Sequence, residues 1–188
     1  YGTIVSYDLN YRASLWQANG GLEACRRINR RIAKYVDVMI GNEEDFTNCL
    51  GYEVEGNDGK FLALNNDGYK RMVRRMMQDY PNVQVVATTL RTVKTASING
   101  WKAICCAGGE LYESMDFPNL EVWDRVGGGD GFATGLIYGL MEGMEPQQAL
   151  NYGVAHGALV QTTPGDTSMA NVQEVRRIVE GQGARVIR

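Results

Sequence analysis

Short apolar runs that alternate with helix-like segments constrain the fold of this chain more than any other feature of the sequence. Residues 36–40 and 83–89 are compact runs rich in Val, and such runs are typical of buried parallel strands. Residues 22–35 and 69–79 carry apolar side chains at helical spacing. The alternation predicts an α/β fold with a mostly parallel sheet and helices on both faces.

The remaining segments extend this pattern. Asn99-Gly100 is a strong hairpin signal, so antiparallel strands are expected on either side of it. With no internal repeat and no linker, the chain is expected to form part of one domain over residues 1–188. The other expected elements are strands at 4–7, 95–99, 101–106 and 110–115, helices at 43–50, 130–142, 146–161 and 171–180, and a polar surface excursion at 53–67.

Composition excludes several classes of protein. Hydrophobic residues make up 44% and charged residues 22% of the 188 residues, which excludes a mainly disordered chain. Lys and Arg number 19 against 22 Asp and Glu, so nucleic acid is an unexpected partner. Residues 131–141 are uncharged but too few to cross a bilayer, so no membrane partner is expected. Helical spacing of Arg26, Arg27, Arg30 and Arg31 predicts a solvated helix face.

The four cysteines and one histidine make a structural metal site an unexpected feature. Cys25, Cys49, Cys105 and Cys106 form no C-x-x-C pair, and only His156 is available to complete a zinc site. Buried free thiols in a reducing cytosol are therefore expected, and the predicted location is cytoplasmic.

A glycine-rich turn, residues 124–135, carries the clearest chemical signal. Gly127, Gly128 and Gly129 lead straight into a predicted helix, where backbone N–H groups and the helix dipole favour an anion such as phosphate. Asp130 stands in the first turn, where a carboxylate can accept a proton from a hydroxyl. The alternative is a flexible loop with Asp130 as an ordinary N-cap.

Glycines at every fourth position of the next helix favour the first interpretation. Gly131, Gly135, Gly139 and Gly143 form a bare stripe, although each glycine costs about 1 kcal/mol relative to alanine in a helix. Close packing of this helix on the sheet would offset that cost. The sequence contains neither G-x-x-x-x-G-K-[ST] nor G-x-G-x-x-G, which excludes P-loop and Rossmann motifs.

The segment Asp124-Arg125-Val126-Gly127-Gly128-Gly129-Asp130-Gly131-Phe132 resembles the C-terminal signature of the PfkB, or ribokinase-like, carbohydrate kinases. The resemblance implies a three-layer α/β/α fold with Asp130 as catalytic base and substrate contact. It also implies that Gly127, Gly128 and Gly129 form an anion hole, with Gly127 and Gly129 contacting the nucleotide.

Two further segments resemble nucleotide-site motifs of this family. Asn42-Glu43-Glu44-Asp45 is similar to its N-x-x-E motif, which implies ATP and Mg²⁺ as cofactors, with Asn42 and Asp45 reaching the metal through water. Asp45 stands where the family has Glu. Thr88-Thr89-Leu90-Arg91 is similar to a T-L-G segment near the nucleotide phosphates, which implies nucleotide contacts for Thr89 and Arg91.

The segment Asp8-Leu9-Asn10-Tyr11-Arg12 resembles a motif of 2-keto-3-deoxygluconate kinases. In those enzymes the matching Arg helps to hold the carboxylate of a sugar acid, so Arg12 is the expected substrate contact. The expected reaction is ATP-dependent phosphoryl transfer to a hydroxyl of a small sugar acid. A surface role for Arg12, and a fructokinase or another sugar or nucleoside kinase, are the alternatives.

The resemblance covers only the C-terminal part of the family's domain. The N-terminal βαβ units and the β-lid are expected to be missing, and a homo-oligomer would form through that lid. A non-catalytic nucleotide-binding fragment is therefore a further alternative, and the isolated chain is expected to lack activity in that case. No role is predicted for His156.

Overall fold

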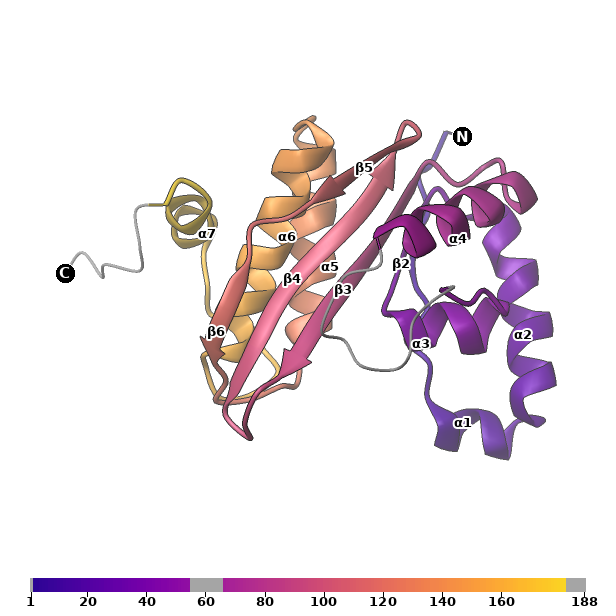
Figure 1. Ribbon diagram of the computed structural model, residues 1–188, viewed down its shortest axis with the longest axis horizontal. Helices are drawn as coiled ribbons and strands as arrows, with labels where there is room; N and C mark the ends of the chain where they lie inside the picture. Colours follow the sequence, from indigo (N-terminus) through magenta and orange to yellow (C-terminus); the bar gives the residue numbers. More distant parts are fainter. Residues whose placement is uncertain (1, 55–65, 182–188) are drawn as a thin grey trace. The chain divides into compact units, whose positions relative to one another are not determined.

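The computed structural model describes residues 2–54 and 66–181, which divide into two compact units. The first contains residues 2–54, 66–88 and 105–111, and the second contains residues 89–104 and 112–181. Six strands form a mixed sheet in the order β1-β2-β3-β4-β5, with β6 paired to β4. Strands β3 (Val85–Val93) and β4 (Ile98–Ala107) run through both units (Figure 1).

Parallel pairing organises the first unit, as the alternation predicts. Strand β1 (Ser6–Asp8) pairs with β2 (Val38–Gly41), and β2 pairs with the first half of β3. All four residues of β2 are buried, because helices and neighbouring strands leave a parallel strand no solvent face. The helical elements are α1 (Ala13–Ala18), α2 (Gly21–Ile32), the 3₁₀ turn η1 (Ala33–Tyr35), α3 (Glu43–Asp45), the π-helical turn η2 (Phe46–Leu50) and α4 (Asn66–Asp79).

The buried face of α4 agrees with its sequence pattern, whereas that of α2 agrees with it only at Cys25. Met72, Val73 and Met76 of α4 are buried as expected. In α2 the buried residues are Ala24, Cys25 and Asn29, whereas the larger apolar side chains Leu22, Ile28 and Ile32 are exposed. Small residues allow α2 to approach its neighbours closely, and periodicity does not reveal that preference.

The arginine cluster of α2 is solvated only in part. Arg26 donates from Nη2 to the carbonyl of Thr47, and Arg30 donates from Nε and Nη2 to the carbonyl of Leu50. These three bonds reach carbonyls of η2 near its C-terminal end, where that of Thr47 also accepts from the N–H of Gly51 at 3.0 Å. Arg27, Arg30 and Arg31 are exposed, as predicted, and only Arg26 is partly buried.

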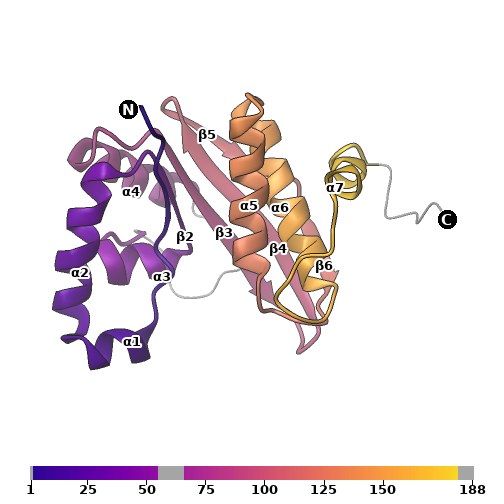
Figure 2. The same cartoon turned by 180° about the vertical axis from the view of Figure 1, so that it is seen from behind.

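Two long helices cover one face of the strands in the second unit. Helix α5 (Gly128–Met141) and α6 (Pro146–Gln161) lie side by side in both views (Figures 1 and 2). Trp101 of β4 donates from Nε1 to the carbonyl of Val154 in α6 at 3.0 Å, which ties that helix to the strand. Strands β5 (Glu110–Glu113) and β6 (Phe117–Glu121) and helix α7 (Val172–Val179) complete the elements.

The hairpin expected at Asn99-Gly100 is wrong. Both residues lie inside β4, with a register irregularity against β6 between Asn99 and Trp101. The turn comes earlier, where Thr95 Oγ1 accepts hydrogen bonds from the N–H groups of Ser97 and Ile98. The side chain of Thr95 therefore makes a turn that the Asn-Gly signal does not indicate. Asn99 itself is fully buried.

The C-terminal helices match their predictions closely. Helix α6 spans the predicted residues, and α7 begins after Asn171, whose side chain forms a reciprocal capping box with Glu174. All four cysteines are buried free thiols. The excursion expected at 53–67 falls largely outside the described residues. Among the described helices, none has the length and apolarity needed to span a membrane.

Candidate functional site

The glycine turn forms an uncapped helix start in the second unit. Gly127 is the N-cap residue of α5 with φ +80°, a conformation that favours glycine, and no side chain caps the helix. The N–H of Gly131 donates to the carbonyl of Gly127 at 2.7 Å. The N–H groups of Gly129 and Asp130 stand earlier in the first turn, where the helix itself offers no acceptor. The turn can therefore donate to an anion.

Asp130 lies in that first turn with its side chain exposed. Its backbone carbonyl accepts a hydrogen bond from Thr134 Oγ1 at 2.7 Å. Gly129 beside it has open space where a Cβ would stand. A carboxylate and backbone donors thus share one accessible helix start, an arrangement suited to accepting a proton beside an anion.

The glycine stripe of α5 packs closely, as predicted, but against α6. The prediction that it packs on the sheet is wrong. A Cβ on Gly131 would stand 2.7 Å from Val160 Cγ2, and one on Gly135 would stand 2.5 Å from the carbonyl oxygen of Tyr152. Gly139 approaches Ala149 to the same degree, at 2.6 Å. Gly143 follows the helix with φ +70° and has no such neighbour. The stripe therefore fixes α5 against α6.

His156 is a functional residue candidate that the sequence left without a role. It is buried on α6, and its Nδ1 lies 2.8 Å from the carbonyl oxygen of Gly131. Because a carbonyl only accepts, Nδ1 carries a proton, and in the neutral ring Nε2 accepts from Ser168 Oγ at 2.7 Å. His156 thus links the first turn of α5 to the segment that follows α6.

Asp124 makes a second link that sequence reasoning missed. Its Oδ1 accepts from the N–H of Val126 at 3.0 Å, and its Oδ2 accepts from the N–H of Gly165 at 3.1 Å. These backbone donors, that of Val126 foremost, lower the pKa of Asp124. As an ionised carboxylate, Asp124 therefore fixes the backbone of the segment just before the glycine turn. An Asp two residues before a turn residue is a signal for such an Asx turn.

In the first unit, Asp45 makes hydrogen bonds to the two predicted segments that follow β1 and β2. Asn42 and Asp45 form a capping box, with Asn42 Oδ1 accepting from the N–H of Asp45 at 3.0 Å and Asp45 Oδ2 accepting from the N–H of Asn42 at 2.8 Å. Asp45 Oδ1 accepts from the N–H of Tyr11 at 2.8 Å. One buried carboxylate thereby fixes the backbone next to Arg12.

The same contacts test the pair as metal ligands. Asp45 is 5% exposed, and both of its oxygens accept backbone N–H groups. Asn42 Oδ1 is also engaged, so the pair offers no direct ligand that suits Mg²⁺. Contact with the metal through water stays a prediction.

Arg12 is accessible, as a substrate contact must be. It precedes α1, its side chain is exposed, and its Nη1 donates to the neighbouring carbonyl of Tyr11 at 3.0 Å. Asn10, two residues before it, has φ +41°, an uncommon conformation for a residue other than glycine. The guanidinium retains donors for a carboxylate.

The segment Thr88–Arg91 lies within a strand, although the sequence predicts that the strand ends at Thr89. Thr88 is buried and donates from Oγ1 to the carbonyl of Gly41 at 2.6 Å, which joins β3 to the end of β2. Thr89 is partly buried and Arg91 is exposed. Their nucleotide contacts stay predictions.

Comparisons with known proteins agree on one family. The model of the pfkB family carbohydrate kinases matches residues 2–173. The chain is 31% identical over 187 residues to a 2-dehydro-3-deoxygalactonokinase of Haloferax volcanii, covering 100% of this chain and 50% of that protein. It is 27% identical over 181 residues to a 5-dehydro-2-deoxygluconokinase of Geobacillus kaustophilus, covering 96% and 47%.

A solved structure supports the fold. The crystal structure of a 2-dehydro-3-deoxygluconokinase from Thermotoga maritima superposes with a TM-score of 0.86 at 34% identity, covering 96% of this chain and 52% of that one. The chain therefore spans about half the length of the relatives that it matches, and its fold is that of the ribokinase-like α/β proteins. From the glycine turn, the strand order and these matches together, the chain belongs to the pfkB family of carbohydrate kinases.

Proposed function

We propose that the protein transfers the γ-phosphoryl group of ATP to a hydroxyl of a small sugar acid, 2-keto-3-deoxygluconate being the favoured substrate. The observation that carries the proposal is the uncapped start of α5, where Asp130 stands exposed beside glycine N–H groups. The relatives whose names specify deoxy sugar acids support the substrate class.

In this proposal the chain contributes three roles. The Asp130 carboxylate accepts the proton of the attacked hydroxyl. The backbone N–H groups of the turn 127–129 stabilise charge on the transferring group, a contribution made without covalent chemistry. Arg12 pairs with the carboxylate of the sugar acid. Mg²⁺ would neutralise phosphate charge when bound. The roles proposed for Asp130 and for the backbone N–H groups do not depend on which residues hold the metal.

The direct test is ADP release by the intact protein with Mg²⁺ and ATP, comparing 2-keto-3-deoxygluconate, fructose, ribose and adenosine. Asp130→Asn is expected to lower turnover by about 100-fold or more and to leave ATP affinity largely unchanged, since it removes a base and keeps the backbone donors. Glu142→Gln, at the exposed end of α5, is the matched control and is expected to retain activity.

Substrate preference separates the proposal from its alternatives. Arg12→Leu is expected to remove the preference for the sugar acid over the neutral sugars. A neutral sugar favoured by the unaltered protein would keep Asp130 as base and identify another sugar kinase. ATP binding without ADP release from any substrate in the panel would indicate a nucleotide-binding protein. Unchanged turnover in Asp130→Asn would contradict the assignment of the base.

A further inference from the structure

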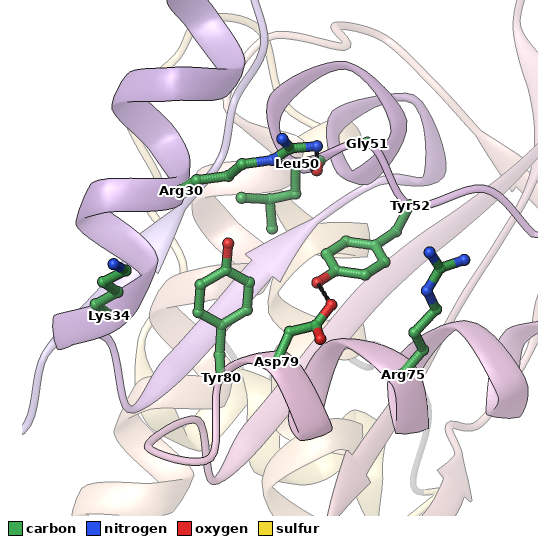
Figure 3. Close-up of a pocket in the computed structure, with 8 residues that line it drawn as sticks. All are labelled: Arg30, Lys34, Leu50, Gly51, Tyr52, Arg75, Asp79 and Tyr80. Carbon is green, nitrogen blue, oxygen red and sulfur yellow. Dashed lines mark hydrogen bonds between the residues drawn. The ribbon is translucent and has the colours of Figure 1, made fainter.

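A pocket lies in the first unit, and none of the residues that the proposed function uses line it. Its volume is about 390 Å³, within the range of small-molecule sites. The ends of α2 and α4 and the turn after η2 form its walls (Figure 3). The lining residues are Arg30, Lys34, Leu50, Gly51, Tyr52, Arg75, Asp79 and Tyr80.

Chain direction separates this pocket from the predicted kinase residues of the same unit. Helices α2 and α4 end at the pocket, and the chain then enters β2 and β3 at their amino ends. Arg12 and Asn42 instead follow the carboxyl ends of β1 and β2. In a parallel sheet these are opposite edges, so the pocket is a site of its own.

One of the cations that line the pocket, Arg30, is held in a fixed position. Arg30 donates from Nε and Nη2 to the carbonyl of Leu50 at 2.9 and 2.8 Å, which leaves the other guanidinium donors available. Gly51 has φ +85°, and a Cβ there would stand 2.7 Å from Arg30 Nη2. A glycine at this turn therefore makes room for the guanidinium.

Two further cations, Lys34 and Arg75, line the pocket. Within residues 2–54 and 66–181, neither of their side chains makes a hydrogen bond or an ion pair. Figure 3 shows the two tyrosines drawn between the three cationic side chains. The one carboxylate of the lining, Asp79, accepts a hydrogen bond from the Tyr52 hydroxyl at 2.5 Å. The lining carries a net positive charge as a result.

The tyrosines add apolar walls and polar hydroxyls. Tyr52 and Tyr80 are each 8% exposed, so their rings form a packed floor. Burial, reinforced for Tyr52 by its bond to Asp79, raises the pKa of both phenols. Both hydroxyls therefore keep their protons at neutral pH. The Tyr52 hydroxyl donates its proton to Asp79, so the Tyr80 hydroxyl is the one that can donate to a ligand.

We infer that this pocket binds a small organic phosphate through Arg30, Lys34 and Arg75. A phosphate monoester carries nearly two negative charges at neutral pH and accepts bidentate bonds from Arg, which matches three cations opposed by one carboxylate. The cavity is larger than the phosphate group alone, and the tyrosine rings can contact the organic remainder.

Site-specific protection tests the inference. The intact protein is treated with a lysine-acylating reagent and with phenylglyoxal, and labelling is quantified by mass spectrometry at constant ionic strength. Glycerol 3-phosphate is expected to protect Lys34 and Arg75 in a saturable manner, inorganic phosphate to protect them at higher concentration, and glycerol to give no protection. Equal protection of the exposed Arg27 and Arg31 would show only non-specific anion adsorption and would overturn the inference.

A pair of double variants gives a second readout at matched net charge. Lys34→Gln with Arg75→Gln is expected to raise the half-maximal glycerol 3-phosphate concentration, measured from thermal stabilisation, by about tenfold or more, because two charge-assisted bonds are lost. Arg27→Gln with Arg31→Gln lies outside the pocket and is expected to bind as the unaltered protein does. An unchanged midpoint in the first variant, or no stabilisation of any form, would contradict the site.

Discussion

At the residue scale, glycines determine how closely α5 packs against α6. The sequence predicts from their spacing that one face of this helix packs closely, and the structure confirms that prediction for Gly131, Gly135 and Gly139. It also distinguishes them from Gly129, which has open space around its Cβ position. The two groups therefore respond in opposite ways to the addition of one methyl group.

Gly135→Ala is expected to destabilise the protein by about 1–3 kcal/mol, because its Cβ would stand 2.5 Å from the Tyr152 carbonyl oxygen and the backbone must shift. Gly129→Ala is the matched control. It is expected to cost nothing and to gain up to about 1 kcal/mol, since alanine is the better helix former. Urea unfolding of the two variants measures the free energies, and equal losses would contradict the packing.

Residue chemistry also shows what a motif leaves open. The resemblance predicts roles for Asn42 and Asp45, but their side chains also form a capping box that holds the backbone of Tyr11. That structural role follows from side-chain direction at a helix start. The sequence reveals the capping pattern. It does not reveal that Asp45 also accepts a hydrogen bond from the N–H of Tyr11, 34 residues away.

At the element scale, α6 supports the start of α5. The glycine stripe brings the two helices into contact, and His156 joins Gly131 to Ser168 across that contact. Ser168 Oγ also accepts from the N–H of Ala170 at 3.3 Å, so the link extends into the segment before α7. A lone histidine on a helix of small residues gives no sign of this connection.

Ser168→Ala is expected to destabilise the protein by about 1 kcal/mol, because it leaves His156 Nε2 buried without its donor. Hydrogen exchange is expected to quicken at the first turn of α5, which His156 contacts. Ser97→Ala, in an exposed turn, is the control and should change neither quantity. Equal exchange in all three proteins would show that His156 does not support α5.

The mistaken hairpin belongs to the same scale. Asn-Gly predicts a turn from two residues, whereas Thr95 makes the turn with its side chain and β4 continues through Gly100. Strand β4 pairs with β3 and β6, and the residues on either side of Gly100, Asn99 and Trp101, both have partners in β6. Local turn preference is overridden when a longer ladder gains more hydrogen bonds.

At the scale of the whole molecule, burial of ionisable side chains sets how stability depends on pH. Burial raises the pKa of the Cys105 thiol to about 12, and it also raises the pKa of Cys25, Cys106 and the Tyr7 hydroxyl. A raised pKa means that the folded state holds protons which the unfolded chain releases near pH 9 for thiols and 10 for phenols.

The contribution of these groups to the free energy of unfolding is therefore expected to be constant up to about pH 8. It is expected to fall as the pH rises above about 9 towards the raised pKa values of the folded state. Urea unfolding at pH 7.5 and 10 measures the change, and thiolate and tyrosinate absorbance report the groups directly. A free energy that is independent of pH in this range would contradict burial of these groups.

The sequence by itself determined the α/β alternation, the helices from Pro146 to Gln161 and around Val172–Val179, and the glycine turn that leads to Asp130. These features depend on periodicity, caps and a long contiguous motif, all of which are local. Only the tertiary structure decided that α5 packs on α6, that His156 and Asp124 hold the turn, and that Arg30, Lys34 and Arg75 share a pocket. Spacing fixes which residues share a face, but the partner of that face comes from distant parts of the chain.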